Sequence, residues 1–91
     1  MPRPCMKRKV RFNPEVTYFK PAGIPLKELQ EVILTKEEIE SLRLINILEL
    51  SQTEAAKKME VSQPTFNRIL KESRKKVSEA IIEGKAIKIE G

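Results

Sequence analysis

Two helix-start signals, eleven residues apart, constrain the fold of this chain more than any other feature. Ser51 is followed three residues later by Glu54, the capping-box pattern in which the serine hydroxyl accepts from a backbone N–H and the glutamate reaches back. Ser62 marks a second start, and Pro64 falls in the first turn after it, where its missing N–H leaves no bond unmade. The segment therefore predicts two helices in quick succession, joined by a short turn.

Apolar residues at helical spacing extend this pattern to three helices. Thr35 and Glu38 form a further capping box ahead of a helix at about 36–48. The second helix is expected from Gln52 to about Met59. The third is expected over about 63–82, ended by Gly84. Its core-facing stripe consists of Phe66, Ile69, Leu70, Ser73, Val77, Ala80 and Ile81.

The second and third helices have the pattern of a helix-turn-helix. A small residue, Ala55 or Ala56, stands where the third helix has to cross closely, and apolar Val61 fills the corner of the turn. The first helix of such a unit usually ends on a residue with positive φ, a position that favours glycine. Glu60 stands there instead, which costs on the order of 1 kcal/mol and is tolerable.

The flanks predict short strands. Val16–Phe19 and Lys85–Ile89 are the main candidates, and Val10–Phe12 is a third. Apolar residues within Leu26–Leu34 predict one or two helical turns. The expected fold class is mainly α, a three-helix helix-turn-helix domain with short terminal β-strands and a basic N-terminal arm. The arm is residues 1–14 and the single domain is 15–91, with the helix-turn-helix core at 51–82.

Charge is distributed unevenly along the chain. Residues 1–13 carry five basic side chains and no acidic one, which equals the whole net charge of +5. Residues 28–54 carry seven glutamates against two basic residues, whereas 57–76 carry seven basic residues against two glutamates. An acidic half followed by a basic half indicates one face suited to a polyanion.

These features predict a duplex DNA ligand. The start of a recognition helix contacts base edges, and its flanks contact phosphates. The candidate base-contacting residues are Gln63, Thr65, Asn67 and Arg68. The candidate phosphate-contacting residues are Arg3, Lys7, Arg8, Lys9, Arg11, Ser62, Lys71, Arg74 and Lys75. The basic arm either tracks the minor groove or phosphates, or contributes its second half to a small sheet.

Several runs of sequence indicate a family. The longer ones are Val-Thr-Tyr-Phe-Lys-Pro-Ala-Gly-Ile-Pro at 16–25, Val-Ser-x-x-Thr-Phe-x-Arg-Ile-Leu at 61–70 and Gly-Lys-Ala-Ile-Lys-Ile-Glu-Gly at 84–91. The shorter ones are Met-Pro-Arg-Pro at the start, Leu-Thr-x-Glu-Glu at 34–38, Leu-Arg-Leu at 42–44 and Glu-Ala-Ala at 54–56. Over nearly its whole length the chain closely resembles the small bacterial and archaeal proteins known as domain of unknown function one-three-four.

That resemblance implies a DNA-binding helix-turn-helix but supplies no target and no regulated process. The helical part also resembles region four of bacterial sigma factors. Members of the family often have glycine where Glu60 stands.

The residue inventory argues against catalysis and against a cofactor. The chain has no His and no Asp, and it contains no glycine-rich loop or nucleophile motif. Its single cysteine, Cys5, excludes an internal disulfide and leaves a metal site dependent on other chains. No apolar run approaches a membrane span of ~20 residues, and no signal peptide is evident. We expect a cytoplasmic protein that is not an enzyme and needs no metal or cofactor.

The expected function is sequence-specific binding of double-stranded DNA, as a transcriptional regulator. A single unit contacts few base pairs, so a homodimer on two half-sites is expected. The alternative is a protein-interaction module that contacts a transcription component through its sigma-like helices. RNA binding ranks lower because the sequence has no aromatic stacking platform. The sequence does not reveal the operator, the direction of regulation or any small-molecule effector.

Overall fold

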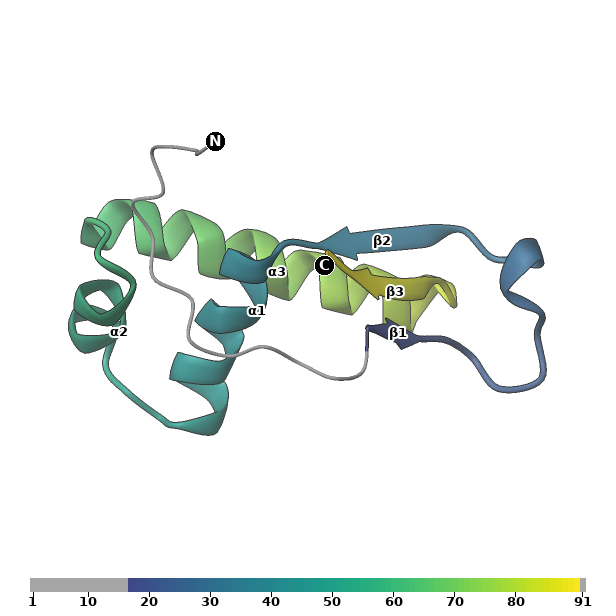
Figure 1. The fold of residues 1–91 in the computed structure, drawn as a ribbon, viewed down its shortest axis with the longest axis horizontal. Coiled ribbons are helices and arrows are strands. Elements are labelled where there is room, and N and C mark those ends of the chain that lie inside the picture. Colours follow the sequence, from purple (N-terminus) through teal and green to yellow (C-terminus); the bar gives the residue numbers. More distant parts are fainter. Residues whose placement is uncertain (1–16, 91) are drawn as a thin grey trace, which may run out of the picture.

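A computed structural model describes residues 17–90 of the chain. Within them the protein is mainly helical, with three helices and a short three-stranded sheet (Figure 1). The helices are α1 (Lys36–Leu42), α2 (Gln52–Met59) and α3 (Gln63–Glu83). The strands are β1 (Tyr18–Phe19), β2 (Glu31–Leu34) and β3 (Ala86–Ile89). The basic arm, the candidate strand Val10–Phe12 and Cys5 lie outside the described residues.

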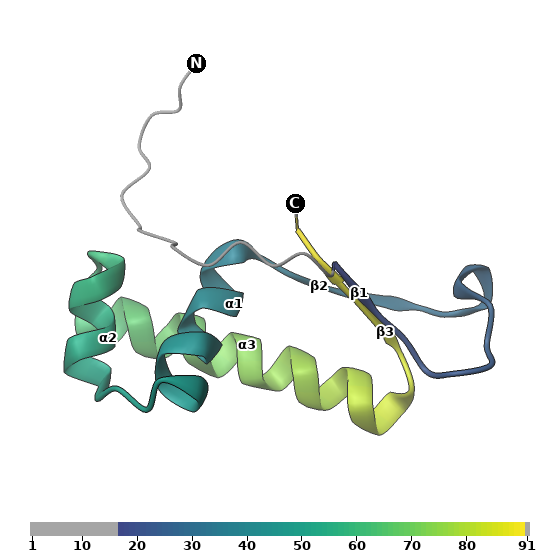
Figure 2. The ribbon, with the colours of Figure 1, turned by 60° about the horizontal axis from the view of Figure 1, so that its bottom comes forward.

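Helix α3 is the axis on which the other elements are arranged. Figure 2 shows α2 crossing near its first turns, α1 against its middle and the sheet over its C-terminal part. Each predicted helix start is confirmed. Thr35 and Ser51 form complete capping boxes with Glu38 and Glu54. These local bonds satisfy backbone N–H groups that would otherwise lack partners at a helix start.

The first predicted helix changes type before it ends. Residues 36–42 are α-helical, and Arg43–Ile47 form a π turn in which Leu48 N–H donates to the carbonyl of Arg43 at 2.9 Å. The wider turn places Leu44 in the core and leaves Leu48 exposed. Leu44 therefore contributes to the core at the end of this helical segment, and Leu48 does not. Single π turns inside helices are frequent at functional sites.

The sheet has the strand order β1-β3-β2, with β1 antiparallel and β2 parallel to β3. Val32 pairs with Ile87 and Leu34 with Ile89, and both β2 residues of these pairs are buried. Parallel neighbours need a long crossover between them. All three helices form that crossover, because β2 precedes α1 and β3 follows α3.

The helical prediction for Leu26–Leu34 is largely wrong. Leu26–Glu28 form one 3-10 turn, but Glu31–Leu34 form strand β2. Four consecutive residues that include three apolar ones do not distinguish a strand from a buried helical turn by periodicity. The pairing with β3, more than fifty residues away, decides the outcome. The predicted terminal strands are present in shorter form as β1 and β3.

The core of the helical half is formed by all three helical segments. Its buried members are Leu44, Ala55, Ala56, Met59, Phe66 and Leu70. Val61 packs against this cluster from the turn, as the sequence predicts. At the other end of α3 the prediction fails for Ile81, whose side chain is 72% exposed. The helix extends beyond the elements that would have to cover that position.

Candidate nucleic-acid interface

The turn between α2 and α3 is a tight left-handed corner. Glu60 ends α2 at φ 59° and ψ 44°, which confirms the positive φ expected at this position. Its N–H donates to the carbonyl of Lys57 at 3.0 Å, and the N–H of Val61 donates to the carbonyl of Ala56 at 3.1 Å. These bonds satisfy the last carbonyls of α2 and set its angle to α3.

The start of α3 is closed by its own side chains. The Ser62 hydroxyl accepts from the N–H of Thr65 at 3.3 Å and donates to Thr65 Oγ1 at 2.9 Å. The N–H of Phe66 donates to the carbonyl of Ser62, and Pro64 has no N–H to offer. An anion at this end would therefore meet the Gln63 N–H and the positive end of the helix dipole. The Ser62 hydroxyl, predicted as a phosphate contact, already makes both of these hydrogen bonds to Thr65.

Gln63 is held by the preceding helix. Thr53 Oγ1, in the first turn of α2, donates to Gln63 Oε1 at 3.3 Å. Both side chains are exposed, so the Gln63 amide is oriented at the surface with its NH₂ group outward from this bond. Nothing in the sequence pattern singled out Thr53, because it lies on the polar side of α2 and matches no motif.

The exposed face of α3 is basic over its first three turns. Asn67, Arg68, Lys71, Arg74 and Lys75 are all exposed, and we call this set the basic end of α3. The opposite side of the same turns carries the buried residues Phe66, Ile69, Leu70 and Ser73. The salt bridges found among residues 17–90 do not involve any cation of the basic end. These cations are thus exposed and form no salt bridge within residues 17–90, although Lys75 lies close enough to Glu79 to help lower the pKa of that carboxyl.

Arg68 lies at the acidic border of this surface. Together with Thr35, Glu37, Glu38, Ile69 and Glu72 it lines a pocket of about 380 Å³. A guanidinium in such surroundings has carboxylates nearby that weaken its attraction for an anion. Of the predicted base contacts, Asn67 is exposed and has no hydrogen-bond partner among residues 17–90. Thr65 is half-buried and bonded to Ser62, Gln63 is bonded to Thr53, and Arg68 borders the acidic pocket.

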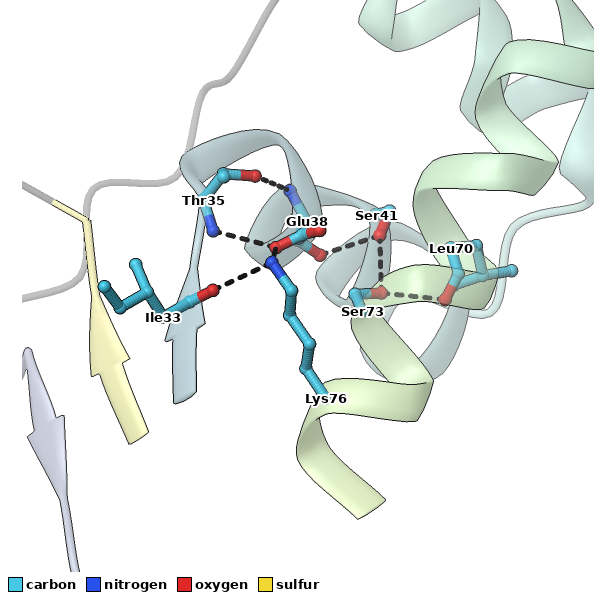
Figure 3. A network of polar contacts seen from close by, with 7 residues as sticks. All are labelled: Ile33, Thr35, Glu38, Ser41, Leu70, Ser73 and Lys76. Atoms are coloured by element: carbon cyan, nitrogen blue, oxygen red, sulfur yellow. Dashed lines mark hydrogen bonds and ion pairs between the residues drawn. The ribbon is translucent and has the colours of Figure 1, made fainter. Parts of the chain in front are cut away.

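A polar network positions α3 against α1 and the sheet (Figure 3). The Glu38 carboxylate accepts from the Thr35 N–H at 2.9 Å and from Lys76 Nζ at 2.9 Å. The same ammonium group donates to the carbonyl of Ile33 in β2 at 2.9 Å. Lys76 therefore joins the middle of α3 to the start of α1 and to the outer edge of β2. Glu38 is buried, so this pairing matters more than an exposed salt bridge would.

The same network continues as a close contact between two serines. Ser41 and Ser73 are fully buried, with their Oγ atoms 3.2 Å apart. Each hydroxyl also lies within hydrogen-bond distance of a carbonyl of its own helix, of Glu38 and Leu70 respectively. Small side chains let α1 and α3 approach closely at this crossing. The sequence signal was the presence of Ser73 in an otherwise apolar stripe, but its partner was not predictable.

The π turn starts on an ion pair between half-buried Arg43 and buried Glu40. Arg43 Nε and Nη2 donate to the two carboxylate oxygens of Glu40, each at 3.0 Å. These bonds raise the pKa of Arg43 above its ordinary value. Glu40 is only 1% exposed, and this bidentate bond stabilises its buried charge. The pair holds the beginning of the π turn in place above the helical core.

The comparisons with known proteins show the family of this chain and no function. Residues 1–91 match the family described as "Protein of unknown function DUF134". The chain belongs to this family. Relatives named "UPF0251 protein" are 52% identical in Halothermothrix orenii, 55% in Caldanaerobacter subterraneus and 54% in Moorella thermoacetica. Each match covers all of this chain and, respectively, 67%, 77% and 61% of the relative. No solved structure matches.

No helix among residues 17–90 is long and apolar enough to cross a bilayer. The same residues contain no group of three or more His, Cys, Asp or Glu side chains placed to hold a metal ion. The candidate site within the described residues is the exposed basic surface of α3, with α2 across its start.

Proposed function

We propose that this protein binds double-stranded DNA in a sequence-specific manner, as a transcriptional regulator, and that α2 and α3 form its helix-turn-helix. The observation that carries the proposal is the division of α3 into a buried apolar side and an exposed basic side that forms no salt bridge within residues 17–90. A helix of this kind fits the major groove, where its polar start faces base edges and its cations face phosphates. The resemblance of the helical part to region four of bacterial sigma factors is part of this proposal.

The residue roles follow from position on α3. Asn67 and Gln63 carry amides that can pair bidentately with adenine, Arg68 can pair with guanine, and Thr65 completes the predicted base-contacting set. Lys71, Arg74 and Lys75 neutralise phosphates, with the start of the helix at Ser62 contributing its dipole. The arm cations, outside the described residues, add affinity: Arg3, Lys7, Arg8, Lys9 and Arg11.

The proposal extends to the protein's state and location. A single unit of this size contacts too few base pairs for high specificity, so the protein acts as a homodimer on paired half-sites. Binding to chromosomal DNA places it in the cytoplasm. Its action is by binding and not by catalysis, and it requires no cofactor or metal.

Selection of bound duplexes from a random pool is the experiment that tests DNA binding and identifies the site together. A recovered consensus, followed by a salt titration, is the expected result. Binding through several phosphates should give a steep fall of log K with log salt, with a slope of about −0.9 per phosphate neutralised. Recovery of no consensus, together with no salt-dependent binding of any duplex, would overturn the proposal.

A pair of matched double variants locates the interface. Replacing Lys71 and Arg74 by glutamine should weaken binding to all duplexes and reduce the salt slope by about two. The control replaces Lys27 and Lys88, two exposed lysines at the sheet end, and removes the same charge. If both doubles weaken binding equally, general electrostatics and not the basic end of α3 is responsible.

One observation favours the competing function of a protein-interaction module. Ile47, at the end of the π turn, is 73% exposed beside exposed Leu48, and such an apolar pair suits a protein partner better than a phosphate backbone. The substitution Ile47→Glu separates the two functions. It should leave duplex binding within about twofold, since it lies outside the DNA surface, and a large loss of function in cells without loss of DNA binding would favour the protein partner.

A further inference from the structure

Exposed apolar side chains gather at one end of the molecule. Nine large hydrophobic residues within 17–90 are exposed, and seven of them lie on the sheet, on the loop before β2 or on the last turn of α3. Phe19 registers with Ile87 on the face of the sheet toward α3, whereas Tyr18 and Ile33 register with Lys88 on the other face, so only part of this set surrounds one groove. The seven are Tyr18, Phe19, Ile24, Leu26, Ile33, Ile81 and Ile82.

The centre of this region is a groove between strand β1 and the end of α3. It has a volume of about 360 Å³ and is lined by Phe19, Pro21, Ala80, Ile81 and Ile87, with lysines at its margin. Phe19 and Ile81 are 53% and 72% exposed on its two walls. Figure 2 shows why the groove is open: α1 and α2 lie toward the other end of α3, and only the sheet lies over its final turns.

The charges around the groove cancel. Lys85 is paired with both Glu79 and Glu83, and Lys20 donates to the carbonyl of Ile24 at 2.7 Å. The rim has no net charge, because its two lysines, Lys20 and Lys85, are balanced by two glutamates, Glu79 and Glu83. A nucleic acid would find no positive field here, and a lipid surface usually requires basic residues around an apolar face. A second copy of the same rim meets no net repulsion, unlike two copies of the basic end.

The geometry points to a second copy of this chain as the occupant of the groove. In a two-fold dimer, the protruding Ile81 of each copy packs against the groove wall of the other, formed by Phe19 and Ile87. The same patch serves on both sides, which is what an isologous interface requires. Ile82, 81% exposed on the same last turn, extends the contact around the end of α3.

Pairing through side chains is favoured over pairing by added strands. The outer edge of β2 is partly blocked, because the carbonyl of Ile33 already accepts from Lys76 Nζ. The other edge strand, β1, has only two residues. A short or blocked edge is a poor template for strand addition. The dimer is therefore assigned to the groove and the helix end.

The dimer is expected to form without DNA. Its role in contacting paired half-sites rests on the proposed function. Helix α3 rises about 27 Å between residues 63 and 81. A two-fold axis near Ile81 then leaves the two basic ends on opposite sides of it and free of the interface. Half-sites about 34 Å apart are within reach of such an arrangement.

The test uses the full chain without DNA and measures its mass by sedimentation equilibrium over a wide range of concentration. The wild type is expected to dimerise. Ile81→Glu and Phe19→Glu each place a charge in the groove and are expected to raise the dimer dissociation constant by roughly thirtyfold or more. Ile47→Glu is the matched control, since Ile47 is the same residue type at 73% exposure but lies at the other end of the molecule.

Thermal melting by circular dichroism shows that each variant is folded. Because all three positions are exposed, loss of the dimer cannot then be attributed to unfolding. A wild type that stays monomeric at every concentration overturns the inference, as does a dimer that survives both groove variants or is lost equally in Ile47→Glu. A monomeric wild type that floats with neutral lipid vesicles would assign the groove to a membrane instead. Duplex binding measured on the same samples reports separately on the proposed function.

Discussion

The two ends of α3 differ in what their exposed surfaces carry. The basic end exposes four cations and the Asn67 amide on the side of α3 opposite the packed core. The last turn of α3 exposes Ile81 and Ile82, which the other elements leave largely uncovered. Both surfaces belong to one unbroken helix of 21 residues. Positive charge repels a second copy and attracts a polyanion, whereas a neutral apolar groove does neither and favours contact with another apolar surface. One rigid helix thus carries two surfaces suited to two different partners.

The comparison also shows where stability resides. At the basic end, Phe66 is fully buried among the helices, and at the apolar end Ile81 is largely exposed. We expect Phe66→Ala to lower the free energy of unfolding by about 3–5 kcal/mol, because it leaves a cavity in the core. Ile81→Ala should change it by less than about 0.5 kcal/mol in the monomer. Urea denaturation at low protein concentration measures both changes. Equal losses of unfolding free energy would contradict the conclusion that stability resides at the basic end.

Lys76 lies between the two ends of α3 and joins the helix to α1 and to β2. Lys76→Met keeps the aliphatic stem but leaves the buried Glu38 carboxylate with fewer partners, which should cost about 1–3 kcal/mol of unfolding free energy. Lys75→Met, on the exposed side one residue earlier, is the control and should be nearly neutral. Denaturant melts of both variants measure the difference. If Lys76→Met leaves the free energy of unfolding unchanged, packing alone orients the sheet on α3.

Within the basic end, base-contacting and phosphate-contacting roles can be separated. Arg68→Ala should relax sequence preference by about 1–3 kcal/mol at the contacted base, if it pairs with guanine as proposed. Lys75→Ala should weaken binding to specific and unrelated duplexes alike and lower the salt slope by about one. Competition binding with both kinds of duplex measures this. Negligible effects from both substitutions would count against α3 as the recognition helix.

The left-handed corner before the basic end is a site for stabilisation. Glu60→Gly relieves the positive φ of 59° and should raise the free energy of unfolding by up to about 1 kcal/mol, less the greater entropy of glycine in the unfolded chain. Glu49→Gly, at φ 58° in the loop before α2, should act in the same direction. Thermal melts measure both changes. Destabilisation by Glu60→Gly would show that contacts of its side chain outweigh the backbone strain.

The smallest expected effect is at the apolar end and depends on pH. The hydrogen bond from Lys85 lowers the pKa of the Glu79 carboxyl and raises the pKa of the Lys85 ammonium. The contribution of this pair is therefore present above the unfolded pKa of the glutamate and is lost as the pH falls through its lower folded value. Wild type should be slightly more stable than Glu79→Gln near neutrality and equal to it in acid. A difference that grows in acid would contradict this sign.

The candidate site was predictable where its geometry is local. The capping residues, the positive φ at Glu60 and the exposure of Asn67, Lys71 and Arg74 all follow from interactions within one or two turns of helix. Strand β2 was missed because its identity depends on β3, and the buried contact between Ser41 and Ser73 joins residues 32 apart. Neither partnership leaves a periodic signal near either residue.

The amino-acid sequence by itself determined three capped helices, a tight corner at Glu60 and a basic surface opposite an apolar stripe, since each of these depends on side chains a few residues apart. Only the tertiary structure decided that the apolar stripe of α3 extends past its cover and leaves Ile81 exposed. Periodicity states which side of a helix is apolar, but burial depends on which other elements reach that side. Here α1 and α2 pack toward the basic end, so the last turn of α3 keeps an apolar surface open.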